Sequence, residues 1–244
     1  MSKAIGQEFM LKTRYAYLEG SGQAQGHTQP ELELPYDTTA PIIKLPEPEL
    51  LPDHAVNFLE LIEMRTSTRK YSDEPLTLAE LSYLLWCTQG VKLVMPGSAT
   101  FRTVPSAGAR HAFETYLLVN NVDGLQPGLY RFLAIDHRLI AIAADDQIAA
   151  EITAACLNQQ FIQTCAVTFI WTAVTARMTW RYGERGYRYM HLDAGHVCQN
   201  LYLAARTLHC GACAIAAFDD DKLNDILGID GEEQFVIYVA TAGK

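Results

Sequence analysis

The 244-residue sequence has little positive charge and no long apolar run. Its net charge of −9 argues against general binding to nucleic acid or to an anionic membrane, because both require clustered Lys and Arg. No stretch of about 18 apolar residues is present, so we expect no membrane-spanning helix. Residues 1–22 also lack the apolar core of a signal peptide, which predicts a cytoplasmic protein. A small anion site is still allowed, since it needs only a few cations and backbone N–H groups.

Motifs of several common enzyme classes are missing as well. There is no G-x-S-x-G elbow, P-loop or Rossmann glycine fingerprint. His191 and His196 are five residues apart and do not share a helix face, which argues against zinc. Cys210 and Cys213 form a C-x-x-C pair that could be a redox pair or half of a zinc site. No second pair follows, and the pair comes after a helix instead of opening one. We therefore expect six reduced structural thiols and no bound metal.

Residues 1–53 differ in composition from the rest of the chain. Their prolines push the preceding residues toward extended conformations. We interpret residues 1–53 as an arm that lies over the body or over a partner subunit, with a disordered tail as the alternative. Residues 54–244 are predicted to form one domain. The residues that mark the arm are Gly20, Gly22, Gly26, Pro30, Pro35, Pro41, Pro46, Pro48 and Pro52.

Apolar periodicity predicts helices and strands that are interleaved without strict βαβ repetition, which is typical of an α+β fold. Thr77 and Glu80 have the spacing of a capping box and open one of these helices. The long helix carries Ala194 and Gly195, small residues that allow close approach of another helix. The expected helices span 53–65, 77–89, 145–158, 187–208 and 220–227, and the expected strands span 115–120, 128–134, 138–142, 167–174 and 235–241.

The segment RTSTRKY at residues 65–71 concentrates three cations and three Ser or Thr hydroxyls just past a helix end. Arginine forks, hydroxyls and loop amides together suit phosphate oxygens. The alternative is a basic helix C-terminus that complements the helix dipole. The segment therefore predicts an anion site, with Arg65, Thr66, Ser67 and Arg69 as its candidate residues.

Two further segments have the composition of a ligand site. PSAGARH at 105–111 is rich in small residues, which let the backbone approach a flat ligand closely. Alone, it is also compatible with any loop before a strand. The segment from Arg181 to Tyr189 mixes aromatic rings, guanidinium groups and glycines, and it could form a lid or a substrate wall. The residues alone therefore predict an α+β enzyme with an anion site.

Six segments, in this order, together resemble the SagB-type branch of the nitroreductase family. The resemblance covers about residues 50 to 244, and the arm is not part of the shared motifs. The segments are RTSTR at 65–69, PSAG at 105–108, YGERGYRY at 182–189, DAGH at 193–196, QNL at 199–201 and AIAAFD at 214–219.

The resemblance implies a nitroreductase α+β fold, with a mixed or antiparallel central sheet flanked by helices, and an intertwined homodimer. It also implies one FMN in each of two clefts between the subunits. Arg65, Thr66, Ser67 and Arg69 would hold the ribityl phosphate or the ring edge. Ala216 and Ala217 would offer backbone N–H groups toward flavin N5, Gln160 would approach the pyrimidine end, and Lys244 would add a phosphate cation. The segment that would reach the flavin from the other subunit is Pro105, Ser106, Ala107 and Gly108.

One position departs from the resemblance. Azoline-oxidising members of this branch share a Lys-Tyr pair before the long helix, where this sequence has Arg181 and Tyr182. Arginine keeps its proton and is a poor general base, although Tyr182 is still a candidate acid or base. Ping-pong reduction of a nitroaromatic or quinone-like acceptor by NAD(P)H is therefore the leading expectation. Oxidation of a peptide-derived heterocycle, with O2 reoxidising FMN, is the second, and a flavin-binding module without turnover is the third.

Overall fold

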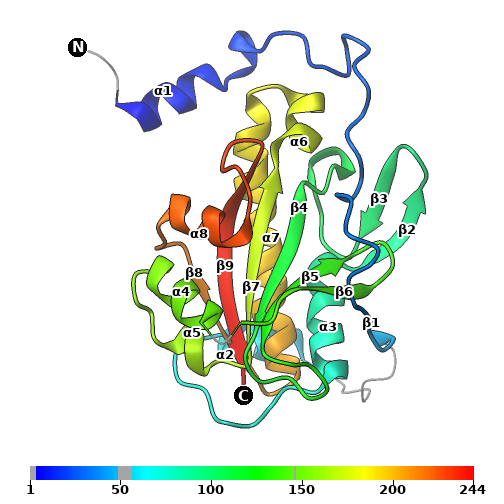
Figure 1. Ribbon diagram of the computed structural model, residues 1–244. Coiled ribbons are helices and arrows are strands. Elements are labelled where there is room, and N and C mark those ends of the chain that lie inside the picture. Colours follow the sequence, from blue (N-terminus) through cyan, green and yellow to red (C-terminus); the bar gives the residue numbers. More distant parts are fainter. Residues whose placement is uncertain (1–3, 49–56, 146) are drawn as a thin grey trace.

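The computed structural model describes residues 4–48, 57–145 and 147–244 (Figure 1). The predicted boundary between residues 53 and 54, and the predicted start of the first helix at residue 53, lie outside these ranges. No helix in the described ranges is long and apolar enough to cross a membrane.

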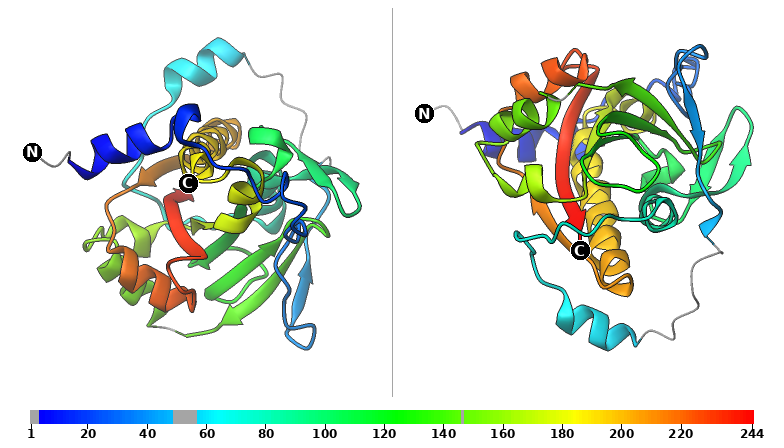
Figure 2. Two further views of the ribbon diagram at one scale, coloured as in Figure 1. Left: turned by 90° about the horizontal axis from the view of Figure 1, so that it is seen from above. Right: turned by 60° about the horizontal axis from the view of Figure 1, so that its bottom comes forward.

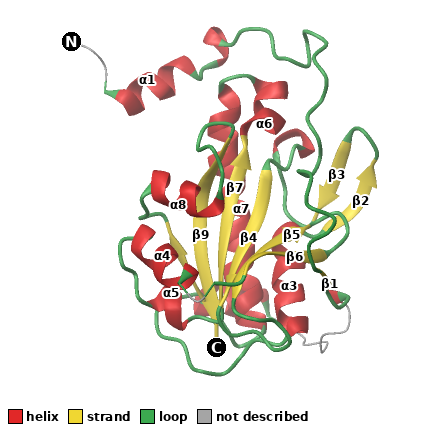
Figure 3. Cartoon of the chain, viewed as in Figure 1, coloured by secondary structure: helices red, strands yellow, loops and turns green. Residues whose placement is uncertain are grey.

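A seven-stranded sheet forms the centre of the molecule, with helices on both of its faces (Figure 3). The strand order is β1-β6-β5-β4-β7-β9-β8, and every neighbouring pair is antiparallel. A separate hairpin pairs β2 with β3. The strands are β1 Ile42–Lys44, β2 Val91–Met95, β3 Ala99–Arg102, β4 Phe113–Val119, β5 Gly128–Leu133, β6 Arg138–Ala143, β7 Val167–Val174, β8 Gly211–Ile215 and β9 Gln234–Gly243.

The two faces of the sheet carry separate apolar cores, because successive residues of a strand point to opposite sides. On one face, Leu117 packs in a cluster with Leu81 and Val197 of α3 and α7. On the other face, Leu118 packs in a cluster with Ile152 and Leu223 of α4 and α8. The helices are α1 Ile5–Lys12, α2 Phe58–Met64, α3 Leu78–Gln89, α4 Ile148–Ala155, α5 Phe161–Thr164, α6 Thr175–Tyr182, α7 Arg185–Thr207 and α8 Asp220–Leu227.

The predicted α+β fold with an antiparallel sheet is confirmed. The capping box of Thr77 and Glu80 opens α3, and α8 has its predicted bounds. The sequence analysis contained no element at α1, β1, α5, α6 or β8, or at the β2–β3 hairpin. In α2 the apolar residues face outward, with Phe58 66% and Leu59 63% exposed. This helix stands away from the body in Figure 2, so its predicted apolar face is not buried within one protomer.

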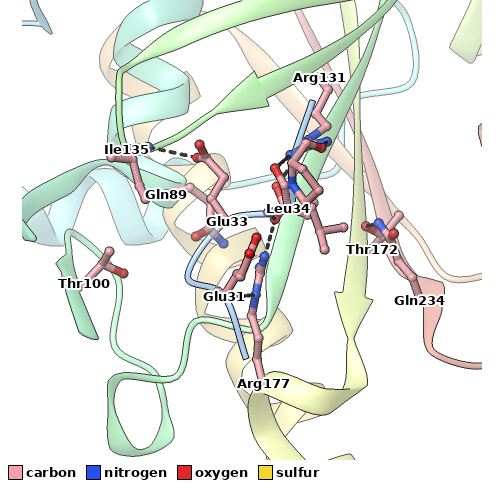
Figure 4. A network of polar contacts seen from close by, with 12 residues as sticks. Glu31, Glu33, Leu34, Gln89, Thr100, Arg131, Ile135, Thr172, Arg177 and Gln234 are labelled. Atoms are coloured by element: carbon pink, nitrogen blue, oxygen red, sulfur yellow. Dashed lines mark hydrogen bonds and ion pairs between the residues drawn. The ribbon is translucent and has the colours of Figure 1, made fainter. Parts of the chain in front are cut away.

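The described part of the arm lies along the body and does not form a core of its own. Strand β1 pairs with β6 at one edge of the sheet. Residues 31–35 run past a buried ionic network (Figure 4), in which Glu114 pairs with Arg177 at 2.6 Å and with Arg131 at 3.4 Å. The guanidinium groups of this network also donate to arm carbonyls, including Glu31 O and Pro35 O.

Candidate functional site

The loop of residues 65–69 is held against the edge of the sheet. Ser67 forms a parallel bridge with Ala212 of β8, and the backbone N–H of Thr68 donates to the carbonyl of Ala212 at 2.9 Å. Gly211 makes this approach possible, because a Cβ there would lie 2.3 Å from Thr68 Oγ1. The loop backbone is therefore fixed, while the side chains of Thr66, Ser67 and Arg69 stay exposed.

Tyr202 of α7 joins this loop to β8, and the sequence analysis did not include it. Its hydroxyl lies 3.0 Å from Ser67 Oγ and accepts a hydrogen bond from the backbone N–H of Ala214 at 2.8 Å. The Arg65 guanidinium stacks on its ring, with Cζ 5.4 Å from the ring centroid. In the described ranges neither Arg65 nor Arg69 forms an ion pair with a carboxylate. The loop thus combines the exposed Arg69 with the half-buried Arg65 and with the exposed hydroxyls of Thr66 and Ser67, which is the donor set of an anion site.

Ala216 and Ala217 lie just beyond the end of β8. The ladder with β9 ends at the pair of Ile215 and Val239, and both alanines are exposed. Ala216 is only two residues after Ala214, or about 7 Å along an extended chain. The backbone N–H groups of this strand end therefore lie on the same edge of the sheet as the loop of residues 65–69.

Gln159, which the sequence analysis did not include, contacts this strand end. Its side-chain amide donates to the carbonyl of Ala217 at 3.1 Å. The predicted Gln160 is exposed, and its amide donates to the carbonyl of Asn158 at 3.3 Å. Of the two neighbouring glutamines, only Gln159 is hydrogen-bonded to the segment that carries Ala216 and Ala217.

Lys244 forms ion pairs with two carboxylates. Its ammonium group lies 2.8 Å from Glu74 Oε1 and 3.2 Å from Glu80 Oε1. The hydrogen bond that Lys244 donates to Glu74 raises the pKa of Lys244. The C-terminal residue also holds the chain just after the loop, because its carbonyl accepts from the N–H of Ser72 at 2.7 Å.

A second group of predicted residues lies near the start of α7. The backbone N–H of Ala107 lies 3.3 Å from Asp193 Oδ2 and 3.4 Å from Oδ1. Ser106 Oγ accepts from the backbone N–H of His111 at 2.9 Å. Burial raises the pKa of Asp193. The carboxylate of α7 thus orients the segment that contains Pro105 to Gly108.

Arg181 and Tyr182, the last residues of α6, pack directly on Gly108. Gly108 has φ +58°, and a Cβ there would lie 2.3 Å from the Tyr182 hydroxyl oxygen and 3.0 Å from Arg181 Nε. Burial lowers the pKa of the neighbouring Arg110, and the positive charge of Arg181 lowers it further. The structure therefore brings together the two segments of residues 105–108 and 181–182, which the sequence analysis treated separately.

The 65–69 loop and the 105–108 segment contact α7 at different positions along its axis. Asp193 contacts the 105–108 segment and Tyr202 contacts the 65–69 loop. They are nine residues apart on α7, which corresponds to about 13 Å along the helix axis. Within one protomer, Arg65 and Arg69 therefore lie apart from Tyr182.

The cysteines have the surroundings of packing residues. Cys210 and Cys213 are buried, and burial raises the pKa of both thiols. Cys213 lies inside β8, where its neighbours pair with β9. In the described ranges no group of three or more His, Cys, Asp or Glu side chains could hold a metal ion.

Comparison with known proteins identifies the family. Residues 62–244 match the Nitroreductase family. A Methanocaldococcus jannaschii protein that carries the name of a nitroreductase is 38% identical over 180 residues, which are 73% of this chain and 88% of that protein. A solved structure of an Anabaena variabilis protein described as a nitroreductase has a TM-score of 0.70 and 30% identity. It aligns with 85% of this chain and 42% of its own length.

The chain therefore belongs to the nitroreductase family, a family of FMN-dependent oxidoreductases. The predicted resemblance to this family is confirmed. The trifolitoxin-processing protein TfxB of Rhizobium leguminosarum bv. trifolii is also similar, at 30% identity over 154 residues. That match covers 62% of this chain and 41% of TfxB, so the chain spans less than half the length of this relative.

Proposed function

We propose that this chain transfers electrons from NAD(P)H to a nitroaromatic or quinone-like acceptor through FMN bound between two copies of the chain. The observation that carries the proposal is the loop of residues 65–69. Its backbone is fixed against β8, while Thr66, Ser67 and Arg69 are exposed and Arg65 is half-buried. A fixed anion site next to free backbone N–H groups fits a cofactor with a phosphate at one end and a polar ring system at the other.

The donor set of the loop suits the FMN phosphate. Arg65 and Arg69 supply charge-assisted hydrogen bonds, and Thr66 and Ser67 supply hydroxyl donors. Lys244 is already paired with Glu74, so we assign the phosphate to the two arginines, with Lys244 as an outer charge. Ala216 and Ala217 would direct backbone N–H groups toward flavin N5, with Gln160 and its neighbour Gln159 at the pyrimidine end.

FMN supplies hydride transfer, and the protein supplies orientation, electrostatics and proton transfer. Tyr182 lies against Gly108 and would donate a proton from its hydroxyl to an acceptor that has become negatively charged. Arg181 beside it would stabilise the same negative charge, because its guanidinium keeps its proton. Ser106 and Ala107 would hold the ring position, since Asp193 accepts a hydrogen bond from the backbone N–H of Ala107.

Affinity for FMN tests the assignment of the loop. We expect Arg65→Ala to weaken FMN binding about tenfold to a hundredfold, because losing one charge-assisted phosphate contact costs about 1.5–3 kcal/mol. Quenching of flavin fluorescence measures the dissociation constant. Arg138→Ala is the matched control, since Arg138 is an exposed arginine on β6, near the opposite edge of the sheet from β8. An unchanged dissociation constant in Arg65→Ala would show that the loop is only a charged helix end.

The separation of the two residue groups along α7 supports a homodimer, in which a second copy brings its 105–108 segment to the loop of the first. Ala194 is buried within its own protomer, whereas Gly195 is exposed and a Cβ there meets no atom within 4 Å. We expect Gly195→Arg to halve the mass measured by light scattering and to lower the FMN content. Gly6→Arg is the control, because Gly6 of α1 is equally open. A dimeric Gly195→Arg protein that retains FMN would contradict the placement of Gly195 in the interface.

Oxidation of a peptide-derived heterocycle is the second candidate function, and the similarity to TfxB favours it. Arg181 stands against it, because the general base that azoline oxidation needs is absent at that position. Anaerobic addition of NADPH to the yellow holoprotein separates the two. Bleaching of the flavin supports NAD(P)H-dependent reduction. A yellow protein that is not bleached favours the peptide reaction or a module without turnover, and a protein that stays colourless after FMN is added contradicts all three.

A further inference from the structure

Buried charges fasten the arm to the body at residues 31–35. Arg177 Nε donates to the carbonyl of Glu31 at 2.8 Å, and Arg131 Nη1 donates to that of Pro35 at 3.0 Å. Both arginines are almost fully buried and pair with the buried Glu114. Undocking the arm would leave these buried donors without partners, which costs free energy. At residues 31–35 the arm is therefore joined to the body through buried polar contacts (Figure 4).

From this anchor the arm passes the C-terminal end of α6. Trp180 Nε1 donates to the carbonyl of His27 at 2.9 Å, and the backbone N–H of Gln23 donates to the carbonyl of Trp180 at 2.8 Å. Gly22 faces the Trp180 ring, where a Cβ would lie 3.4 Å from Cδ1. Trp180 directly precedes Arg181 and Tyr182, so the arm runs beside the residues that we place on the substrate side.

The arm then reaches the first turns of α7, next to α1 in Figure 2. Arg185 Nη1 donates to the carbonyl of Thr13 at 2.8 Å. Arg188 donates to the carbonyl of Met10 at 3.0 Å and also to the Thr13 hydroxyl. Two arginines of one helix thus hold the same turn of the arm.

Tyr15 follows this turn, and it is fixed although 69% of it is exposed. The Arg185 guanidinium lies over its ring, with Cζ 4.3 Å from the centroid. Its hydroxyl lies 2.9 Å from that of Tyr189, which also accepts from Arg185 Nε at 2.7 Å. Tyr189 in turn meets the Tyr182 ring edge-on, with the centroids 4.9 Å apart. A continuous series of contacts therefore leads from Tyr15 to Gly108.

We infer that Tyr15 is a specificity-determining residue, whose ring stacks on the planar conjugated group of the acceptor. Arg185 covers one face of the ring and, with Tyr189, holds it in one orientation, so the opposite face is the one that a flat molecule would contact. Tyrosine suits this task, because a rigid amphipathic ring gives large contact area and stacks favourably on other π-systems. The inference rests on the proposed function, in which Tyr182 borders the acceptor.

The oxidative half-reaction tests the inference without NAD(P)H. The holoenzyme is reduced anaerobically with a stoichiometric amount of dithionite and mixed with menadione, which takes up a hydride and a proton to become its hydroquinone. We expect Tyr15→Ala to raise the half-saturating menadione concentration about threefold to tenfold, with an unchanged limiting rate. Tyr15→Phe keeps the ring and is expected to stay close to wild type.

Two controls make the result specific. Tyr17→Ala removes a second exposed ring from the same turn, 57% exposed, and we expect no change in the half-saturating concentration. Ferricyanide takes electrons without stacking, so it should reoxidise Tyr15→Ala and wild type at equal rates. A slower reaction with ferricyanide would mean that Tyr15 acts on the flavin environment, and it would overturn the inference.

The inference and the proposed function fail in different ways. If the protein binds FMN and reduces menadione, but Tyr15→Ala has the wild-type half-saturating concentration, the inference is wrong and the proposed function stands. If the wild-type protein binds no FMN, or its reduced flavin does not react with menadione, the proposed function is wrong and the role of Tyr15 falls with it.

Discussion

Glu114→Gln is expected to lower the free energy of unfolding by about 3–5 kcal/mol, which is the cost of breaking a buried ion pair by removing one partner. Glu114 is 3% exposed and pairs with Arg177 at 2.6 Å and Arg131 at 3.4 Å. Glutamine has nearly the same shape but no charge, so two guanidinium groups would stay buried without the carboxylate with which they pair. Urea denaturation followed by circular dichroism measures the change.

The same substitution should loosen the arm. Glu114 Oε1 accepts from the backbone N–H of Leu34 at 2.9 Å, and both paired arginines also donate to arm carbonyls. We therefore expect limited proteolysis to cleave the arm faster in Glu114→Gln than in wild type.

An exposed ion pair gives the matched control. Glu74 pairs with Lys244 at 2.8 Å, but its side chain is 65% exposed. Glu74→Gln should therefore change the stability by less than about 1 kcal/mol. Equal effects of Glu74→Gln and Glu114→Gln would contradict a special role for the buried network.

The elements predicted from the sequence are those in which the local pattern agrees with the tertiary structure. Strand β7 is rich in β-branched and aromatic residues and lies in the middle of the sheet, where such residues are favoured. The start of α3 has its own capping signal. Strand β8 was missed because its sequence GACAI consists mostly of small residues with weak strand preference. It is a strand because β9 pairs with it along its length.

Helix α6 was missed for a related reason. It is short and mostly polar, and only three of its residues, Thr175, Arg177 and Met178, are buried. One of these is Arg177, whose guanidinium is buried because Glu114 lies 2.6 Å away on β4. The sequence did contain a signal for this buried ion pair. Glu114 is a charged residue in a mostly apolar strand, and Glu is rarely buried without a partner. The sequence could not identify that partner, which lies 63 residues away.

Some residues of the candidate site could likewise be inferred from the sequence, and others only from tertiary contacts. The 65–69 loop could be proposed as an anion site from the sequence because its cations and hydroxyls are contiguous. Tyr202 and Gln159 could not, because each reaches the site only through a tertiary contact, to Ser67 and to Ala217. Asp193 lay in a motif shared with the family, but its contact with the N–H of Ala107 depends on how α7 packs.

Tyr182→Phe should slow the transfer of electrons from reduced flavin to the acceptor by about 10²–10⁴, the range for loss of a general acid. The substitution keeps the ring, so the edge-on contact with Tyr189 should persist, while the hydroxyl oxygen that lies against Gly108 is removed. Only the hydroxyl that would protonate the acceptor is lost. Stopped-flow mixing of the reduced enzyme with menadione measures the limiting rate.

Separate measurements distinguish this chemical role from a structural one. Flavin content and the rate of reduction by NADPH should be unchanged in Tyr182→Phe, because neither step uses the proton. Tyr187→Phe is the matched control, since Tyr187 lies on α7 and stacks on Phe235 with centroids 6.5 Å apart. If Tyr182→Phe retains its flavin and the wild-type limiting rate with several acceptors, Tyr182 is a packing residue only. If the rate falls as expected, Arg181→Lys then tests whether restoring the Lys-Tyr pair gives azoline oxidation.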